Sequence, residues 1–253
     1  MGTLFIWIIA ASLIGGVVSL VGGFLLLFRE RLARRLSLYL VSLAIGALLG
    51  AAFFDLLPES LELFEEQAGS RNLVFGTAVA GIIILFIFEK FLKWYHCHEE
   101  VQCSVHTWSS AVILGDAIHN FIDGVVITIS FFVSTPVGVA TTAAVFFHEI
   151  PQEIGDFGVL LHAGYKRAKI IFLNTLTALA TPLGAVIAFF IAPVFINILP
   201  YFLTFAAGGF IYIAVADLLP QIQTRSRGSD FSHLAVIILG IAIIFLVGIL
   251  VPE

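Results

Sequence analysis

Two apolar segments, residues 106–132 and 136–162, contain imidazole, carboxylate and amide side chains that lie close together in the sequence. These side chains are Asp116, His119, Asn120 and Asp123 in the first segment and His148, Glu149, Gln152, Glu153 and Asp156 in the second. Such groups supply the nitrogen and oxygen atoms that bind divalent metal ions, and several of them can also transfer protons. The two segments therefore form the candidate functional site.

Helical spacing brings several of these side chains onto common faces. His119 and Asp123 are four residues apart, as are His148 and Gln152, so each pair lies on one side of a helix. The residue after each histidine lies about 100° further around its helix. Because only a short stretch joins the two segments, we expect antiparallel neighbouring helices whose polar faces meet. Such a pair can enclose a site of mixed nitrogen and oxygen ligands.

Both histidines are expected near the centre of a membrane. His119 and His148 each lie roughly 20 Å from the start of their predicted helix. An ionised group at that depth costs about 2.5–3.5 kcal/mol, so a cluster of them needs compensation. A bound cation provides it. Two alternatives remain open from residue types alone: a polar network that holds helices together, and a proton relay without metal.

The donor types narrow the choice of cation. Imidazole with carboxylate and amide oxygen suits Zn²⁺, Fe²⁺ and Mn²⁺. Copper(I) prefers sulfur ligands, yet Met1 is the one methionine and neither cysteine lies in a predicted helix core. Mg²⁺ and Ca²⁺ prefer oxygen-only shells, so two histidines argue against them. We expect Zn²⁺ first, followed by Fe²⁺, Mn²⁺ and Cd²⁺.

The composition indicates what must position these groups. Of 253 residues, 60% are hydrophobic and 11% charged, with a mean hydropathy of +1.09. Soluble domains have about 25% charged residues, so the chain is expected to be embedded in a lipid bilayer. The net charge of −5 and the absence of a long basic stretch exclude a nucleic-acid partner. Two cysteines are too few for a disulfide scaffold.

The apolar runs predict an all-α membrane protein with eight transmembrane helices in a single domain over residues 1–253. The predicted helices are 4–28, 36–57, 72–94, 106–132, 136–162, 170–191, 198–220 and 231–251. Pro193 and Pro200 divide a stretch of 47 uncharged residues into two of these helices. The first helix follows no basic residues and is long, so we interpret it as a retained helix rather than a signal peptide.

Lysine and arginine predict the orientation. With these eight helices, all of the twelve basic residues except Arg71 fall on one side. The basic side of a membrane protein faces the cytoplasm. We therefore expect a multi-pass protein with its N- and C-termini outside.

Two segments resemble each other in sequence. Residues 44–58 read AIGALLGAAFFDLLP and residues 206–220 read AAGGFIYIAVADLLP, which end in Asp-Leu-Leu-Pro at Asp55 and Asp217. They fall in the second and seventh predicted helices, which run in opposite directions. This indicates an inverted repeat of helices 1–3 and 6–8 around a central pair, helices 4 and 5, as in secondary transporters. Asp55 and Asp217 then lie near opposite faces, where each is a candidate for attracting cations, or an ordinary interfacial charge.

The loop before the fourth helix, residues 95–106, is rich in metal-binding side chains and is expected in the cytoplasm. These side chains are His96, Cys97, His98, Cys103 and His106. Their composition suggests an acceptor or sensor for metal, while an ordinary polar loop is the alternative.

Two motifs carry a resemblance to a known family. HNFIDG at 119–124 and HEIPQEIGD at 148–156 resemble the fourth- and fifth-helix motifs of the Zrt/Irt-like (ZIP) family of divalent metal transporters, and the Asp-Leu-Leu-Pro ending of helix 2 is also typical of it. The resemblance covers essentially the whole chain. It implies metal movement toward the cytoplasm through a binuclear site on helices 4 and 5.

The resemblance also implies ligand roles. The first metal would be held by His119, Asp123, His148 and residue 152, and the second by Asn120, Asp123 and Glu149, with Asp123 bridging. Asp116, Glu153 and Asn174 are further candidates for the site or the pathway. Gln152 departs from the histidine usual in the subfamily, and its weaker carbonyl oxygen is expected to affect metal preference.

Other readings of the site remain as alternatives. HEIPQ invites comparison with the His-Glu-x-x-His motif of metalloproteases, but Gln152 replaces the second histidine, so we do not expect an enzyme. A metal-selective channel would need the same ligands. The resemblance further suggests a prokaryotic cytoplasmic (inner) membrane, a homodimer, and divalent metal ions as transported substrate rather than resident cofactor.

Overall fold

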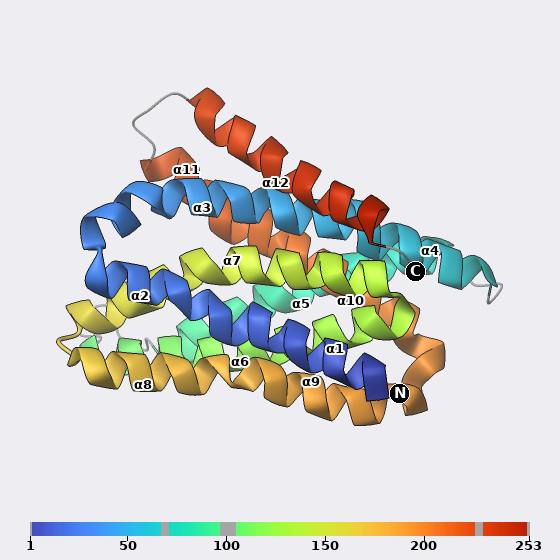
Figure 1. Cartoon of the computed structure of the whole chain (residues 1–253), viewed down its shortest axis with the longest axis horizontal. Helices are drawn as coiled ribbons and strands as arrows, with labels where there is room; N and C mark the ends of the chain where they lie inside the picture. The colour runs from blue at the N-terminus through green and yellow to red at the C-terminus, as the bar shows by residue number, and fades with distance from the viewer. Residues whose placement is uncertain (1, 67–70, 97–104, 226–229, 252–253) are drawn as a thin grey trace.

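A computed structural model describes residues 2–66, 71–96, 105–225 and 230–251. Within these ranges the backbone is helical and forms a bundle of eight stretches without strands (Figure 1). The first four stretches are α1–η1–η2–α2 (Gly2–Ser12, Leu13–Val17, Val18–Leu20, Val21–Phe28), α3–η3–α4 (Glu30–Gly50, Ala51–Leu56, Leu57–Glu66), α5 (Arg71–His96) and α6 (Val105–Val133). The others are α7 (Thr135–His162), α8–α9–η4 (Arg167–Ala178, Ala180–Ile191, Ala192–Ile198), α10–η5–α11 (Leu199–Tyr212, Ile213–Leu218, Leu219–Arg225) and α12 (Asp230–Leu250).

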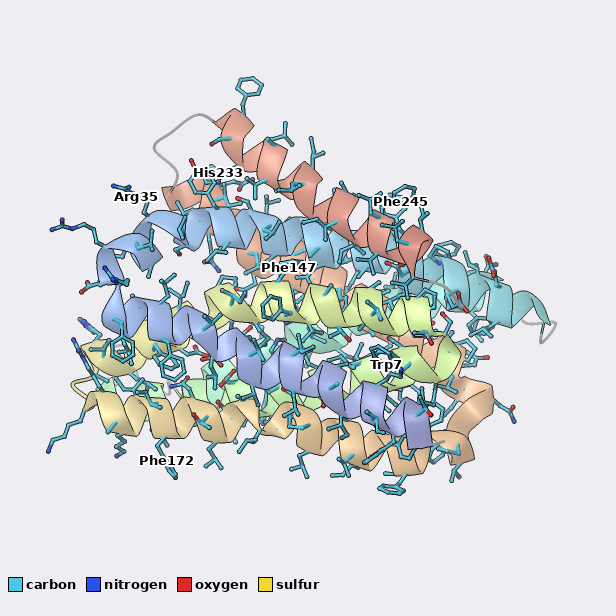
Figure 2. The ribbon with its side chains drawn as sticks, in the orientation of Figure 1. Trp7, Arg35, Phe147, Phe172, His233 and Phe245 are labelled. Atoms are coloured by element: carbon cyan, nitrogen blue, oxygen red, sulfur yellow. The ribbon has the colours of Figure 1, made fainter. Side chains whose placement is uncertain are left out.

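The bundle has the surface of a membrane protein. Six stretches are long and apolar enough to cross a bilayer, and α5 contains a shorter apolar segment, 72–88. Large apolar side chains such as Phe172 point away from the bundle (Figure 2), as is typical of a surface that faces lipid. The predicted all-α membrane fold is thus confirmed, and the predicted break between the sixth and seventh helices occurs at η4, before Pro200 in α10.

The second helical stretch is longer than predicted. Its expected range was 36–57, whereas it runs from Glu30 to Glu66. The prediction followed the uncharged run, but the helix continues into polar surroundings, where Arg34 and Glu30 form an ion pair of 2.8 Å one turn apart.

α7 lies inside the bundle and packs against α2, α3 and α6. Of its residues, His148 and Glu149 are among the buried ones, and Pro151 lies one turn beyond Phe147 without interrupting the helix. Both ends of the described chain lie at one end of the bundle, and the junctions α2–α3 and α7–α8 lie at the other (Figure 1). Arg35 lies at that second end, opposite Trp7 (Figure 2).

α6 and α9 are in unusually close contact. A Cβ added to Gly124 of α6 would collide with the carbonyl oxygen of Thr181, and one added to Gly184 of α9 would collide with that of Phe121. Glycine at both places lets the two backbones touch, as is common for helices in lipid. This contact fixes α9 against the helix that carries His119.

The two Asp-Leu-Leu-Pro sequences adopt the same local structure. Each lies at the junction of a π-helical segment, η3 or η5, with an α-helix. The Leu57 N–H donates to the Ala52 carbonyl, and the Leu219 N–H donates to the Ala214 carbonyl, five residues back in both cases. The following prolines, Pro58 and Pro220, have no N–H to donate. The sequence similarity therefore extends to an unusual backbone feature, which supports the predicted repeat.

Candidate metal centre

Four side chains converge between α6 and α7. They are His119 and Asp123 from α6 and His148 and Glu149 from α7, and one ligand atom from each lies within 4.8 Å of the others. Asp123, His148 and Glu149 are buried, whereas His119 is 21% exposed. Antiparallel packing of two helices with i, i+4 and i, i+1 spacing is sufficient to produce this group, which we call the four-ligand cluster.

The distances from the two histidine Nε2 atoms to each other and to the two carboxylates are similar. The two histidine Nε2 atoms are 3.1 Å apart. From His119 Nε2 it is 3.6 Å to Asp123 Oδ2 and 3.4 Å to Glu149 Oε1. From His148 Nε2 it is 3.2 Å to Asp123 Oδ2 and 3.6 Å to Glu149 Oε1.

Five of the six separations match those between the ligands of a tetrahedral metal ion. Zinc binds imidazole nitrogen and carboxylate oxygen at about 2.0–2.2 Å, so neighbouring ligands of a tetrahedral site are roughly 3.3 Å apart. The five distances of 3.1–3.6 Å fall on both sides of that value. The sixth separation, between the Asp123 and Glu149 oxygens, is within 4.8 Å, so a single ion can contact all four residues when these two carboxylates close on it.

A backbone carbonyl orients the His148 ring for metal binding. Its Nδ1 lies 3.0 Å from the carbonyl oxygen of Ala144, one turn earlier in α7. A carbonyl only accepts, so Nδ1 carries the hydrogen and the lone pair of the neutral ring is on Nε2. Metal-binding histidines are commonly oriented in this way by a partner on the other ring nitrogen.

Carboxylate oxygens in the cluster lack hydrogen-bond donors. Asp123 Oδ2 and both Glu149 oxygens are buried and receive no hydrogen bond. Buried carboxylates without donors or cations are strongly unfavourable, so these atoms indicate that a cation completes the cluster. This is an argument against the alternative of a purely structural polar network, in which such oxygens would be bonded.

Asn120 and Gln152 lie outside the four-ligand cluster. The Asn120 Nδ2 donates to Asp116 Oδ1 at 2.9 Å and to the Asp116 carbonyl at 3.2 Å, while Gln152 Nε2 is 3.4 Å from the same Oδ1. The Asn120 oxygen accepts a hydrogen bond of 2.6 Å from Thr181 of α9. Both amides thus face Asp116, and Glu149 occupies the position in the cluster that the resemblance gave to residue 152.

Further acids lie on the same side as Asp116. Glu153 is buried and neither of its oxygens receives a hydrogen bond. Asp156 lies one turn after Gln152, and it is close enough to both Asp116 and Asp217 to be repelled by each of them electrostatically. Acidic side chains therefore continue from the four-ligand cluster through buried Asp116 and Glu153 and half-buried Asp156 to exposed Asp217.

Asn174 was a further candidate from the sequence. Asn174 is buried in α8 and donates to the Ile170 carbonyl of its own helix at 2.8 Å. Cys97, His98 and Cys103 lie outside the described residues, as do the side chains of His96 and His106 at the ends of α5 and α6.

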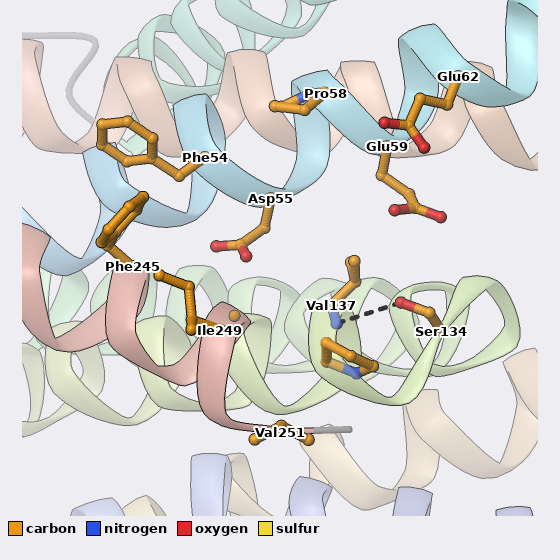
Figure 3. A pocket seen from close by; sticks show the side chains of 12 residues that line it. Phe54, Asp55, Pro58, Glu59, Glu62, Ser134, Val137, Phe245, Ile249 and Val251 are labelled. Atoms are coloured by element: carbon orange, nitrogen blue, oxygen red, sulfur yellow. Dashed lines mark hydrogen bonds between the residues drawn. The ribbon is translucent and has the colours of Figure 1, made fainter. Parts of the chain in front are cut away.

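Asp55 faces a cavity of about 450 Å³ near the C-terminal end of α12 (Figure 3). Glu59 and Glu62 from the next turns of α4 line the same cavity, and no Lys or Arg is among the described residues that do so. Asp55 is 93% buried, with a relative exposure of 7%, and its Oδ2 atom receives no hydrogen bond. The cavity is therefore acidic, and one of its carboxylates has a free oxygen.

A family model described as "ZIP Zinc transporter" matches residues 3–109 and 93–248. The chain belongs to the ZIP zinc transporter family. The ZIP relatives include zinc transporter ZIP13 of Pongo abelii, 33% identical over 223 residues, which are 84% of this chain and 67% of the relative. An uncharacterized zinc transporter of Schizosaccharomyces pombe is 40% identical over 120 residues, 44% of this chain and 26% of the relative. Human zinc transporter ZIP10 is 40% identical over 122 residues, 48% of this chain and 15% of the relative.

These ZIP relatives differ from the chain in length. The chain spans about two thirds of the ZIP13 sequence but only about a quarter of the yeast protein and about a seventh of ZIP10. All three come from eukaryotes, so they give no support to the predicted prokaryotic origin.

Two contacts of the candidate site were not predicted from the sequence. Thr181 contacts Asn120 although it lies 61 residues later, and no spacing rule connects them. The Ala144 carbonyl beside His148 follows directly from helical geometry, because it is the backbone acceptor one turn earlier.

Proposed function

We propose that the chain transports divalent metal ions across the membrane, with Zn²⁺ as the main substrate and Fe²⁺, Mn²⁺ and Cd²⁺ as further candidates. The observation that carries this proposal is the four-ligand cluster, whose five distances of 3.1–3.6 Å suit one tetrahedral ion in the middle of the bundle. Membership in the ZIP family supports the same substrate class. The metal ion is the cargo, and the chain carries out no covalent chemistry on it.

Movement toward the cytoplasm by alternating access is part of the proposal. The repeated π-turns at Leu57 and Leu219 support an inverted repeat, in which two related halves surround α6 and α7. The basic residues at one end of the bundle support a cytoplasmic position for that end, with both termini outside. The proposal also includes a multi-pass position in a cytoplasmic membrane and assembly as a homodimer.

His119, Asp123, His148 and Glu149 bind the first ion in this proposal. Asn120 joins Asp123 and Glu149 at the second ion of a binuclear site, and Gln152 approaches the first. Neither amide contacts the four-ligand cluster in this structure, so both side chains rotate away from Asp116 when they bind metal. Asn174 is held by its own helix and is the weakest of these candidates.

Acidic groups on both sides of the cluster guide the cation. Asp55 lies in the cavity at the end of the bundle that holds both termini and attracts ions from outside (Figures 1 and 3). Asp116, Glu153, Asp156 and Asp217 follow on the other side and receive the ion after the cluster. The loop of His96, Cys97, His98, Cys103 and His106 then accepts or senses arriving metal.

Uptake into liposomes tests the proposal. The full chain is reconstituted, and Zn²⁺ uptake is measured against time and concentration for the wild type, Asp123→Ala and Glu30→Gln. Glu30 is a matched control because its carboxylate is 63% exposed and lies far along the chain from the cluster. We expect saturable uptake that is lost in Asp123→Ala and retained in Glu30→Gln.

Other outcomes identify the alternatives. Uptake that rises linearly with Zn²⁺ in the wild type would indicate a channel. Equal uptake in the wild type and Asp123→Ala would reject the cluster as the transport site. Cleavage of a membrane-embedded peptide, abolished by Glu149→Gln, would indicate a protease instead.

A further inference from the structure

The side chain of Asn120 has hydrogen-bond partners at both ends. Its oxygen accepts from Thr181 Oγ1 at 2.6 Å, and its nitrogen donates to Asp116 Oδ1 at 2.9 Å. Asn120 and Thr181 are both fully buried. The hydrogen-bond pattern itself fixes which end of the amide is oxygen, because the carboxylate accepts and the hydroxyl donates.

Packing determines where the Thr181 hydroxyl lies. Gly16 of η1 and Gly124 of α6 both approach this residue: a Cβ at Gly16 would clash with the Thr181 side chain, and one at Gly124 would clash with its carbonyl oxygen. Thr181 is also the second residue of α9, directly after the junction with α8. The hydroxyl is therefore held by three helical stretches rather than by a flexible segment.

The side of α6 that faces Thr181 is not the side that faces the four-ligand cluster. Gly124 lies one turn after Asn120 and touches the same Thr181, so Asn120 and Gly124 share the face against α9. His119 lies about 100° away around α6, on the face that meets His148. The Asn120 oxygen, the only atom of this side chain able to bind a metal ion, thus points toward α9.

We propose that Thr181 is a positioning residue that withholds the Asn120 oxygen from the second metal ion. This inference rests on the proposed binuclear site. The second ion binds when the Thr181–Asn120 hydrogen bond breaks and the amide turns toward Asp123 and Glu149. The first ion needs none of these groups to move. Occupancy of the second position is therefore coupled to the contact between α6 and α9.

If Thr181 instead supported Asn120 as a metal ligand, its removal would change the affinity for the second ion in the opposite direction. Partners of metal ligands often support them, and removing such a partner weakens metal binding about 10- to 100-fold. A hydroxyl that withholds a ligand has the reverse effect, because its removal frees the amide. The sign of the change in second-ion affinity therefore distinguishes the two roles.

The test uses the purified full chain and Cd²⁺, titrated by calorimetry with the bound ions counted per chain. Thr181→Val keeps the side-chain shape without the hydroxyl, and Thr181→Ser keeps the hydroxyl as the matched control. We expect Thr181→Val to tighten second-ion binding by about threefold to tenfold, the range given by one ordinary hydrogen bond. First-ion affinity is expected to stay unchanged, and Thr181→Ser to behave as wild type.

A double-mutant cycle with Asn120→Ala links the effect to the amide. In the Asn120→Ala background, Thr181→Val is expected to leave second-ion affinity unchanged. Thr181→Ala provides the same loss of the hydroxyl with a smaller side chain if the valine variant does not fold. Binding of one ion to the wild type and two to Thr181→Val would also support the inference.

Two results overturn the inference. Second-ion affinity that is equal or weaker in Thr181→Val and Thr181→Ala rejects it while leaving first-ion binding intact. One bound ion in the wild type and in both variants rejects it as well. Failure of the proposed function is a separate result, because then not even the first ion binds in a way that depends on Asp123.

Discussion

The Nε2 atoms of His119 and His148 lie 3.1 Å apart, on two different helices and with Asp123 and Glu149 on either side. Two neutral imidazoles whose lone pairs face each other at this distance repel unless a proton or a cation lies between them. The neighbouring carboxylates favour the cation. The first prediction follows from this pair.

Replacing His148 by alanine is expected to abolish the first metal site. His148 contributes one of two nitrogen ligands, so the loss should exceed the 10- to 100-fold typical of an outer partner. Calorimetric titration with Zn²⁺ measures it. His233→Ala is the matched control, since His233 is also buried, but it pairs with Ser42 at 2.9 Å and stacks on Tyr39, away from the cluster. Equal losses in the two variants would contradict a ligand role for His148.

Gln152→His is expected to tighten Zn²⁺ binding. An imidazole is a stronger zinc ligand than an amide oxygen, and residue 152 lies one turn after His148 on the same face. We expect about a tenfold lower dissociation constant, equivalent to about 1.4 kcal/mol. Gln152→Asn, which keeps the amide but shortens the side chain, separates the effect of the imidazole from loss of the contact with Asp116. Unchanged or weaker Zn²⁺ binding in Gln152→His would reject the prediction.

Gly124→Ala is expected to destabilise the protein. The added Cβ collides with the Thr181 carbonyl, so α6 and α9 must separate, at a cost of about 1–3 kcal/mol. Gly76→Ala is the control, because nothing lies within 4 Å of a Cβ at Gly76 in α5, and alanine favours the helix. Thermal unfolding in detergent compares the two. Unfolding temperatures that fall equally, or not at all, would show that the close contact is unimportant.

Asp55→Asn is expected to raise the KM for Zn²⁺ uptake about fivefold at low salt, because one unit charge at 4 Å contributes about 1 kcal/mol in water. The maximal rate should change little, since Asp55 is outside the four-ligand cluster. The effect should shrink at high salt, where the charge is screened. Asp55→Glu keeps the charge and serves as the control. A loss of maximal rate with KM unchanged would place Asp55 in a different role.

The sequence was sufficient to predict the eight helices and every member of the four-ligand cluster. His119, Asp123, His148 and Glu149 lie in two adjacent segments, so helical spacing alone brings them near one another. The orientation of Asn120 was beyond prediction, because it depends on Thr181 in a helix that is distant in sequence. Rotamers of buried polar residues are set by such tertiary partners, whereas the faces of a helix are set by spacing.

The backbone of the second helical stretch was also beyond prediction. Periodicity indicates a helix but does not distinguish an α-turn from a π-turn, and Pro58 fits either one. Asp55 was named from its sequence similarity to Asp217, yet the cavity in front of it is completed by α12 and the start of α7, whose packing no local pattern reveals.

The π-turns at Leu57 and Leu219 also have a consequence for the history of the chain. A π-turn contains one residue more than an α-turn, and single-residue insertions into helices produce such turns. Both π-turns overlap the same four letters at the same offset. One ancestral insertion that was later copied explains this more simply than two independent events. Deleting one residue from 51–54 would then restore an older α-helical form, in which Asp55 points about 100° away from its present cavity.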